Sequence, residues 1–343
     1  MTASHPTAPP PLRIVFWEST TRCNLSCVHC RRLEDGSRSP DELTTDEVRS
    51  VIDSAAELGK PIFIFSGGEP LMRDDWEALA AHATQKALPT ALATNGTMVD
   101  ADMAGRIAAA GFRRVSVSFD GADPATHDAF RGVEGAFDAA RTGALHLRAA
   151  SVPTQVNATI AAHNDGQLDD LLALTRSLGA VALHLFLLVP VGCGVKIGPT
   201  HQLPPERYEA VLEWVLDRQA QTDIEVRATC APHYYRLAAR RGRDVTRSRG
   251  CLGGVAVAFV SHTGEVFPCG YLPVRCGSVR EQTLADVWRE STVFADLRDP
   301  DRLTGKCGRC GYRTLCGGCR ARAYAATGDY LSEEPACVYR PGG

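Results

Sequence analysis

The chain carries the segment CNLSCVHC at residues 23–30, which sets three cysteines at x3 and x2 spacing. Three thiolates can hold three irons of a cubane iron–sulfur cluster, and the fourth iron is then open to a substrate or a second cofactor. The alternative is half of a zinc site, although zinc cysteines normally come as two Cys-x2-Cys pairs. The apolar run at residues 12–17 predicts a buried strand just before the cysteines. The cysteines are therefore expected on the loop after a first strand, where barrel enzymes keep their chemistry.

Apolar runs alternate with helical patterns over roughly the first half of the chain. A capping box at Thr44–Glu47 opens an amphipathic helix between the first two runs. Strand–helix repeats of this length favour a parallel sheet, and six of them fit a partial barrel better than a closed eight-fold one. The predicted fold class is α/β, a partial (β/α)6 TIM-like barrel followed by a cysteine-rich domain. The six predicted strands cover residues 13–17, 61–66, 89–94, 113–119, 154–160 and 181–188.

The composition excludes several classes of protein. A length of 343 residues allows one large domain and a smaller one, and a net charge of −3 suits neither nucleic acid nor an anionic membrane. No apolar run approaches the length of a membrane span. Residues 1–11 are polar and proline-rich, so they predict a flexible tail and no secretion signal. In a chain expected to be cytoplasmic, thirteen cysteines indicate metal ligation rather than disulfides.

Polar residues follow several predicted strands. Gly67, Gly68 and Glu69 come after the second strand, where glycines let the backbone approach a ligand and a carboxylate suits an ammonium group. The alternative for this segment is a plain turn. Further candidates for hydrogen bonds to ribose or carboxylate groups are Ser118, Asp120 and Asn157. Each of them could equally be an ordinary polar turn or a satisfied core side chain.

The cysteine run and the Gly-Gly-Glu-Pro segment one strand later resemble the radical S-adenosylmethionine (SAM) superfamily. The resemblance implies that Cys23, Cys27 and Cys30 hold a [4Fe–4S] cluster whose open iron is chelated by SAM. It implies that Gly67, Gly68 and Glu69 hold the methionine amino group, that His29 packs near the adenine, and that Ser118, Asp120 and Asn157 contact the ribose or the carboxylate. The expected partners are a small-molecule substrate and an external one-electron reductant of flavodoxin or ferredoxin type. The expected chemistry is hydrogen abstraction by a 5′-deoxyadenosyl radical.

The remaining cysteines gather near the C-terminus. By spacing alone they could build two further clusters or a pair of zinc ribbons. The pattern resembles the SPASM extension of radical SAM enzymes, which implies one or two auxiliary [4Fe–4S] clusters. The implied ligands are Cys307, Cys310, Cys316 and Cys337 for an outer cluster, and Cys251, Cys269 and Cys319 for an inner one.

The inner cluster lacks an obvious fourth ligand. Cys230 is the first choice for that place and Cys276 the second, and without either the inner cluster would keep an open iron. The predicted domains are a barrel at 12–200, a bridging helical segment at 201–229 and a SPASM domain at 230–340. An arginine-rich stretch at 236–249 is interpreted either as a solvated basic loop or as a fork that binds substrate carboxylates.

Several segments resemble the heme-synthase branch of the superfamily, namely residues 16–20, 228–236, 260–271 and 316–324. Members of that branch decarboxylate the propionates of an iron tetrapyrrole, and enzymes resembling it decarboxylate cytosylglucuronate in nucleoside-antibiotic pathways. The resemblance implies radical decarboxylation of a carboxylated small molecule. A glucuronyl nucleoside ranks first and a tetrapyrrole second, because Arg22 stands directly before Cys23, whereas the heme enzymes tend to place arginine one residue earlier. Modification of a ribosomal peptide is a further alternative, and a zinc-bound scaffold is the non-enzymatic one.

Overall fold

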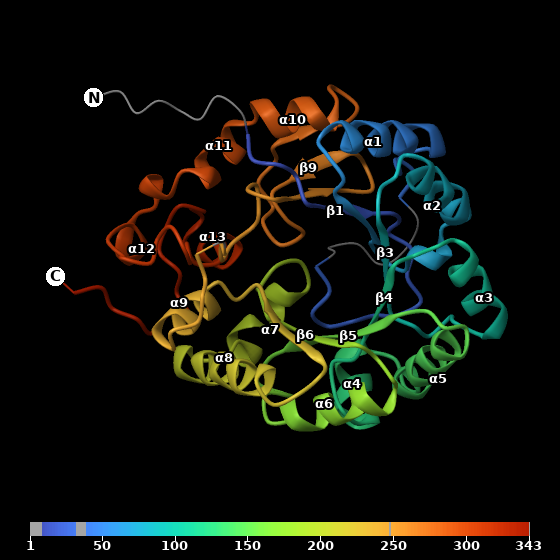
Figure 1. The fold of residues 1–343 in the computed structure, drawn as a ribbon, viewed down its shortest axis with the longest axis horizontal. Helices are drawn as coiled ribbons and strands as arrows, with labels where there is room; N and C mark the ends of the chain where they lie inside the picture. Colours follow the sequence, from blue (N-terminus) through green and yellow to red (C-terminus); the bar gives the residue numbers. More distant parts are fainter. Residues whose placement is uncertain (1–8, 32–38, 247, 343) are drawn as a thin grey trace.

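The computed structural model describes residues 9–31, 39–246 and 248–342. Within them a single sheet runs in the order β10-β9-β8-β1-β2-β3-β4-β5-β6-β7 (Figure 1). The strands are β1 (Ile14–Glu18), β2 (Ile62–Ser66), β3 (Thr90–Thr94), β4 (Arg114–Ser118), β5 (Thr154–Ile160), β6 (Ala182–Leu187), β7 (Glu225–Thr229), β8 (Val257–Val260), β9 (Glu265–Phe267) and β10 (Gly277–Ser278). The partial barrel and its six expected strands, β1 to β6, are confirmed to within one residue.

Helices surround the parallel strands on the outside of the curved sheet (Figure 1). The capping box is present, since the Thr44 hydroxyl accepts from the N–H of Glu47 and the Glu47 carboxylate accepts from the N–H of Thr44. The helices are α1 (Thr45–Glu57), η1 (Pro70–Met72), α2 (Trp76–Gln85), α3 (Ala101–Ala109), α4 (Pro124–Arg131), α5 (Ala136–Ala149), α6 (Leu168–Ser177), α7 (Gly194–His201), α8 (Pro205–Gln219), α9 (His233–Arg240), α10 (Leu284–Glu290), α11 (Thr292–Arg298), η2 (Pro300–Arg302), α12 (Gly305–Gly308) and α13 (Arg320–Thr327).

Two parallel strands extend the sheet beyond the six expected ones. The segment 201–229, expected to be helical, contains α8 but ends in β7, which pairs with β6. The sequence does not predict strand β7, because only Val226 of its five residues is buried and the apolar pattern is too weak to indicate a strand. Strand β8 pairs with β1 at the other end of the barrel, so the C-terminal part of the chain builds directly onto the first strand.

Side chains alternate between the two faces of the barrel strands. On β4, Val115 and Val117 are fully buried against the helices, while Ser116 and Ser118 on the opposite face are only partly buried. On β5, Asn157 and Thr159 occupy that same inner face. The apolar core therefore lies between sheet and helices, and the inside of the barrel is polar, as a site for a polar ligand requires.

Parallel strands place their carboxyl ends at one edge of the sheet. The cysteine loop after β1, the glycines after β2 and Asp120 after β4 all lie at that edge. Among the residues that the structure describes, no helix is both long and apolar enough to cross a membrane.

Candidate functional site

The cysteine loop lies against the end of β2. The N–H of Gly68 donates to Thr20 O at 2.8 Å, and the N–H of Glu69 donates to Arg22 O at 2.7 Å. A Cβ on Gly68 would lie 2.1 Å from Arg22 O, and Gly67 has a φ of +133°, which disfavours any other residue. The two glycines therefore let the cysteine loop pack directly on the sheet. The loop carries Cys23, Cys27 and Cys30.

The end of α4 holds the loop from another side. The N–H of Ser26 donates to Arg131 O at 3.3 Å, and the N–H of Val28 donates to Phe130 O at 3.0 Å. A Cβ on Gly132 would lie 2.4 Å from Ser26 O. Nothing in the spacing of residues 130–132 marks them as neighbours of the cysteines, so the sequence does not predict this contact.

Two side chains direct N–H groups at the sulfurs. Asn95 Nδ2 lies 3.9 Å from Cys23 Sγ, and Arg131 Nη1 lies 3.8 Å from Cys27 Sγ. Burial raises the pKa of Cys27 to about 11, although Arg131 opposes the shift. The thiol thus stays protonated at neutral pH unless a metal replaces its proton. Hydrogen bonds to sulfur and burial are the means by which proteins tune iron–sulfur clusters, so this environment fits cluster ligands.

Asp120 is a fully buried carboxylate beside the cysteine loop. Its Oδ2 lies 2.7 Å from Arg131 Nη2 and 3.2 Å from His29 Nε2, and its Oδ1 accepts from the N–H of Thr159 at 2.6 Å. Despite the opposing effect of burial, Arg131 and His29 hold the pKa of Asp120 below its usual value. Both oxygens are thus engaged by protein groups, so Asp120 orients His29 and Arg131 beside the cysteines.

The imidazole of His29 belongs to a column of rings. It stacks on Phe130 with ring centroids 4.1 Å apart, and Phe130 stacks on His163 at 3.9 Å. Burial lowers the pKa of His29 to about 4, although Asp120 favours its protonation. The ring is therefore neutral at physiological pH, which suits the expected packing near an adenine.

Glu69 is fully buried at the ends of β2 and β3. Its carboxylate accepts from Thr94 Oγ1 at 2.8 Å, from the N–H of Asn95 at 2.8 Å and from the N–H of Leu71 at 3.2 Å. Burial nevertheless raises the pKa of Glu69 to about 7. An ammonium group nearby would favour the ionised carboxylate, so the position fits a methionine amino group.

Ser118 and Asn157 face each other across β4 and β5 on the inner face of the barrel. The Ser118 hydroxyl donates weakly to Thr94 O at 3.4 Å, and Asn157 Oδ1 accepts from Gln155 Nε2 at 2.6 Å. Both side chains are half-buried and lie at the same edge of the sheet as the cysteine loop.

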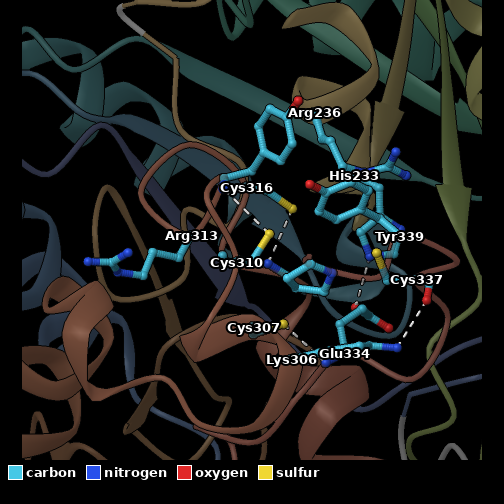
Figure 2. Close-up of a pocket in the computed structure, with 14 residues that line it drawn as sticks. His233, Arg236, Lys306, Cys307, Cys310, Arg313, Cys316, Glu334, Cys337 and Tyr339 are labelled. Carbon is cyan, nitrogen blue, oxygen red and sulfur yellow. Dashed lines mark hydrogen bonds and ion pairs between the residues drawn. The ribbon is translucent and has the colours of Figure 1, made fainter. Parts of the chain in front are cut away.

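The four cysteines expected to bind the outer cluster line one pocket, together with His233, Arg236 and Lys306 (Figure 2). Short N–H contacts to sulfur again support a cluster environment. Backbone N–H groups approach three of the sulfurs: Tyr312 to Cys310 at 3.4 Å, Gly318 to Cys316 at 3.5 Å and Glu334 to Cys307 at 3.4 Å. The pocket-lining cysteines are Cys307, Cys310, Cys316 and Cys337.

Four further cysteines gather beside this pocket. The pKa of the Cys230 thiol is raised well above its usual value, first by burial and then by the neighbouring sulfurs. Cys230 has a φ of +56°, a strained conformation for a residue other than glycine, and its carbonyl accepts from Tyr208 Oη and Arg322 Nη2. Cys276, the second choice, instead contacts Val274 O and lies near Ser291 and Arg298. The gathered cysteines are Cys230, Cys251, Cys269 and Cys319.

One buried ion pair joins the two C-terminal cysteine groups. Arg322 Nη1 lies 3.1 Å from Glu334 Oε2, and both side chains are almost fully buried. The N–H of Cys319, in the inner group, donates to Glu334 Oε2 at 2.7 Å. The N–H of Glu334 in turn points to Cys307 of the outer group. Glu334 therefore connects the two groups by hydrogen bonds on both sides.

Three arginines of the arginine-rich stretch contact the preceding helix. Arg236 pairs with Glu209, Arg241 pairs with Glu213 and Asp217, and Arg243 donates to Gln219 Oε1 at 2.7 Å. All four acceptors lie on α8. Both sequence-based interpretations overlooked these partners, because they come from a helix about 25 residues earlier.

Comparisons with known proteins give a consistent result. The model of the radical SAM superfamily matches residues 17–175, and that of the SPASM iron–sulfur cluster-binding domain matches residues 251–311. AdoMet-dependent heme synthase from Methanosarcina barkeri (strain Fusaro) is 47% identical, over 96% of this chain and 97% of that one. The enzyme of that name from Nitratidesulfovibrio vulgaris is 43% identical, over 98% of each chain. The crystal structure of Streptococcus suis SuiB bound to S-adenosylmethionine is 17% identical, with a TM-score of 0.77, over 96% of this chain and 78% of that one.

Replacing Gly68 with alanine will displace the cysteine loop, because the new Cβ meets backbone rather than a movable side chain. We expect G68A to lose SAM cleavage and part of its iron. The matched control is G105A on α3, where a Cβ has open space and the variant should keep both. Iron per chain and 5′-deoxyadenosine formation measure the effect, and normal cleavage by G68A would contradict it.

SAM affinity should rise with pH and level off above about pH 7, the pKa at which the Glu69 carboxyl is half ionised. Below that pH the carboxyl carries a proton that the methionine ammonium must displace, so each lower pH unit weakens binding by up to about tenfold. The variant E69Q should flatten this dependence, whereas E57Q at an exposed position should preserve it. SAM titrations between about pH 5.5 and 8 test the prediction, and a pH-dependent E69Q would refute it.

The Arg322–Glu334 pair should set the potentials of the auxiliary clusters. Reduction adds negative charge, so E334Q should raise their midpoint potentials and R322Q should lower them. The double variant should return toward the wild-type values. Redox titration followed by electron paramagnetic resonance measures these shifts, and shifts of the same sign in both single variants would indicate only structural damage.

Proposed function

This chain belongs to the radical SAM superfamily and carries its SPASM iron–sulfur domain, and from that premise we propose that it decarboxylates the propionate side chains of an iron tetrapyrrole. Its cofactors are a [4Fe–4S] cluster that binds SAM and auxiliary iron–sulfur clusters. The observation that carries the proposal is identity above 40% over nearly the whole chain with two AdoMet-dependent heme synthases. This finding reverses the ranking from the sequence analysis, which placed a glucuronyl nucleoside first.

Conversion of a propionate to a vinyl group removes one hydrogen atom, one carbon dioxide and one electron. When bound, SAM and its cluster supply the 5′-deoxyadenosyl radical that takes the hydrogen. The auxiliary clusters supply an acceptor for the electron. The electron that starts each cycle needs an external donor, which we propose to be of flavodoxin or ferredoxin type.

The residues of the chain have separate tasks in this reaction. Glu69 and the adjoining glycines hold the amino acid part of SAM, and the Asp120–Arg131 pair orients His29 beside the cysteine loop. Because the pKa of His29 is about 4, its ring is neutral and adds no charge beside the cofactor. The half-buried Ser118 and Asn157 offer hydrogen bonds inside the barrel.

Tyr271 is a buried phenol that is influenced by residues of both cysteine regions. Burial raises the pKa of the phenol, and Cys230, Arg31, Cys269 and Asp120 act on it as well. We propose that the electron released from the substrate passes to the inner cysteine group.

The test is anaerobic turnover of the reconstituted, reduced enzyme with SAM and a ferric or ferrous porphyrin that carries propionates. We expect 5′-deoxyadenosine, carbon dioxide and a product that has lost carbon dioxide and two hydrogens per converted chain, all absent in C27A. Parallel reactions contain cytosylglucuronate or a ribosomal precursor peptide. Mass spectrometry distinguishes the outcomes, and conversion of either alternative with an unchanged porphyrin would overturn the proposal.

A further inference from the structure

His201 ends α7 at the edge of the barrel that carries the cysteine loop. Its ring centroid lies 5.9 Å from that of His163 and 6.0 Å from that of Phe130, so it extends the column that begins at His29. The start of α7 is tied to the same loop, since the N–H of Cys193 donates to Cys30 O at 2.8 Å. His201 therefore belongs to the neighbourhood of the first cluster, although no motif marks it.

Thr200 holds the Nδ1 side of the His201 ring. Thr200 Oγ1 lies 3.2 Å from Ile197 O and 2.8 Å from His201 Nδ1. When the hydroxyl donates its single hydrogen to Ile197 O, which can only accept, Nδ1 donates its own hydrogen to the hydroxyl. In that arrangement the neutral ring keeps its lone pair on Nε2.

The Nε2 atom of His201 is available to a ligand. Within residues 9–31, 39–246 and 248–342 no hydrogen bond to this atom is found, and the side chain is half-buried rather than enclosed. The other two histidines of the column differ. Nε2 of His29 faces the Asp120 carboxylate, and Nε2 of His163 lies 3.0 Å from Asp120 O, with its Nδ1 buried and without a partner.

Building on the proposed function, we infer that His201 Nε2 binds the iron of the tetrapyrrole substrate as an axial ligand. Histidine is a common axial ligand of tetrapyrrole iron, and ligating histidines characteristically donate their other ring N–H to a fixed acceptor. Thr200 Oγ1, 2.8 Å from Nδ1, is positioned to be that acceptor. The bond is a lone-pair donation to iron, so no electron or proton is exchanged. It holds the macrocycle at the edge of the barrel where the radical forms.

Binding of two probes to the reconstituted enzyme tests this inference, namely a ferric porphyrin carrying four propionates and its metal-free counterpart. Wild type should bind the ferric probe with the electron paramagnetic resonance signature of imidazole-ligated iron. In H201A that signature should disappear and affinity for the ferric probe should fall roughly tenfold or more, while affinity for the metal-free probe stays unchanged. Added imidazole should restore the signature.

Three further variants complete the design. H146A on α5 is the matched control and should behave as wild type. T200V removes the acceptor of Nδ1 and should weaken ferric binding less than H201A does. An unchanged signature in H201A, or its loss in H163A alone, would overturn the role of His201 while leaving the proposed function intact. Failure of wild type to bind either porphyrin would instead refute the proposed function.

Discussion

The site depends on close backbone packing around the first cysteine loop. The loop is hydrogen-bonded to Gly68 and Glu69 on one side and to the end of α4 on the other. At Gly68 and Gly132 the approach leaves no room for a side chain. Three thiols that must grip one cluster need fixed relative positions, and backbone contacts on two sides supply them without relying on flexible side chains.

Desolvation controls the charge of this region. Burial keeps the Cys27 thiol protonated, makes His29 neutral and leaves Glu69 only about half ionised near neutral pH. Without its cofactors the site thus carries little charge apart from the Asp120–Arg131 pair. A cationic iron centre and the ammonium group of SAM would ionise the sulfurs and Glu69, so binding of the cofactors and ionisation of the site are thermodynamically linked.

In the C-terminal domain a buried ion pair, rather than close backbone packing, connects the cysteine groups. Eight cysteines form two groups, and Glu334 contacts one cysteine of each. Arg322 and two backbone N–H groups compensate for the burial of this carboxylate. The strained backbone at Cys230 is fixed by the same arginine, which links the position of the inner group to that of the outer pocket.

The sequence alone determined the strands β1 to β6, the ligand candidates in both cysteine-rich regions and the edge of the sheet where they lie. These features follow from local spacing and from the rule that parallel strands end together. Only the tertiary structure decided that Arg131 and Phe130 support the cysteine loop, that Cys230 lies near the other inner cysteines, and that Arg236, Arg241 and Arg243 contact α8. Such contacts join residues distant in the chain, and their energies depend on burial, which no local pattern records.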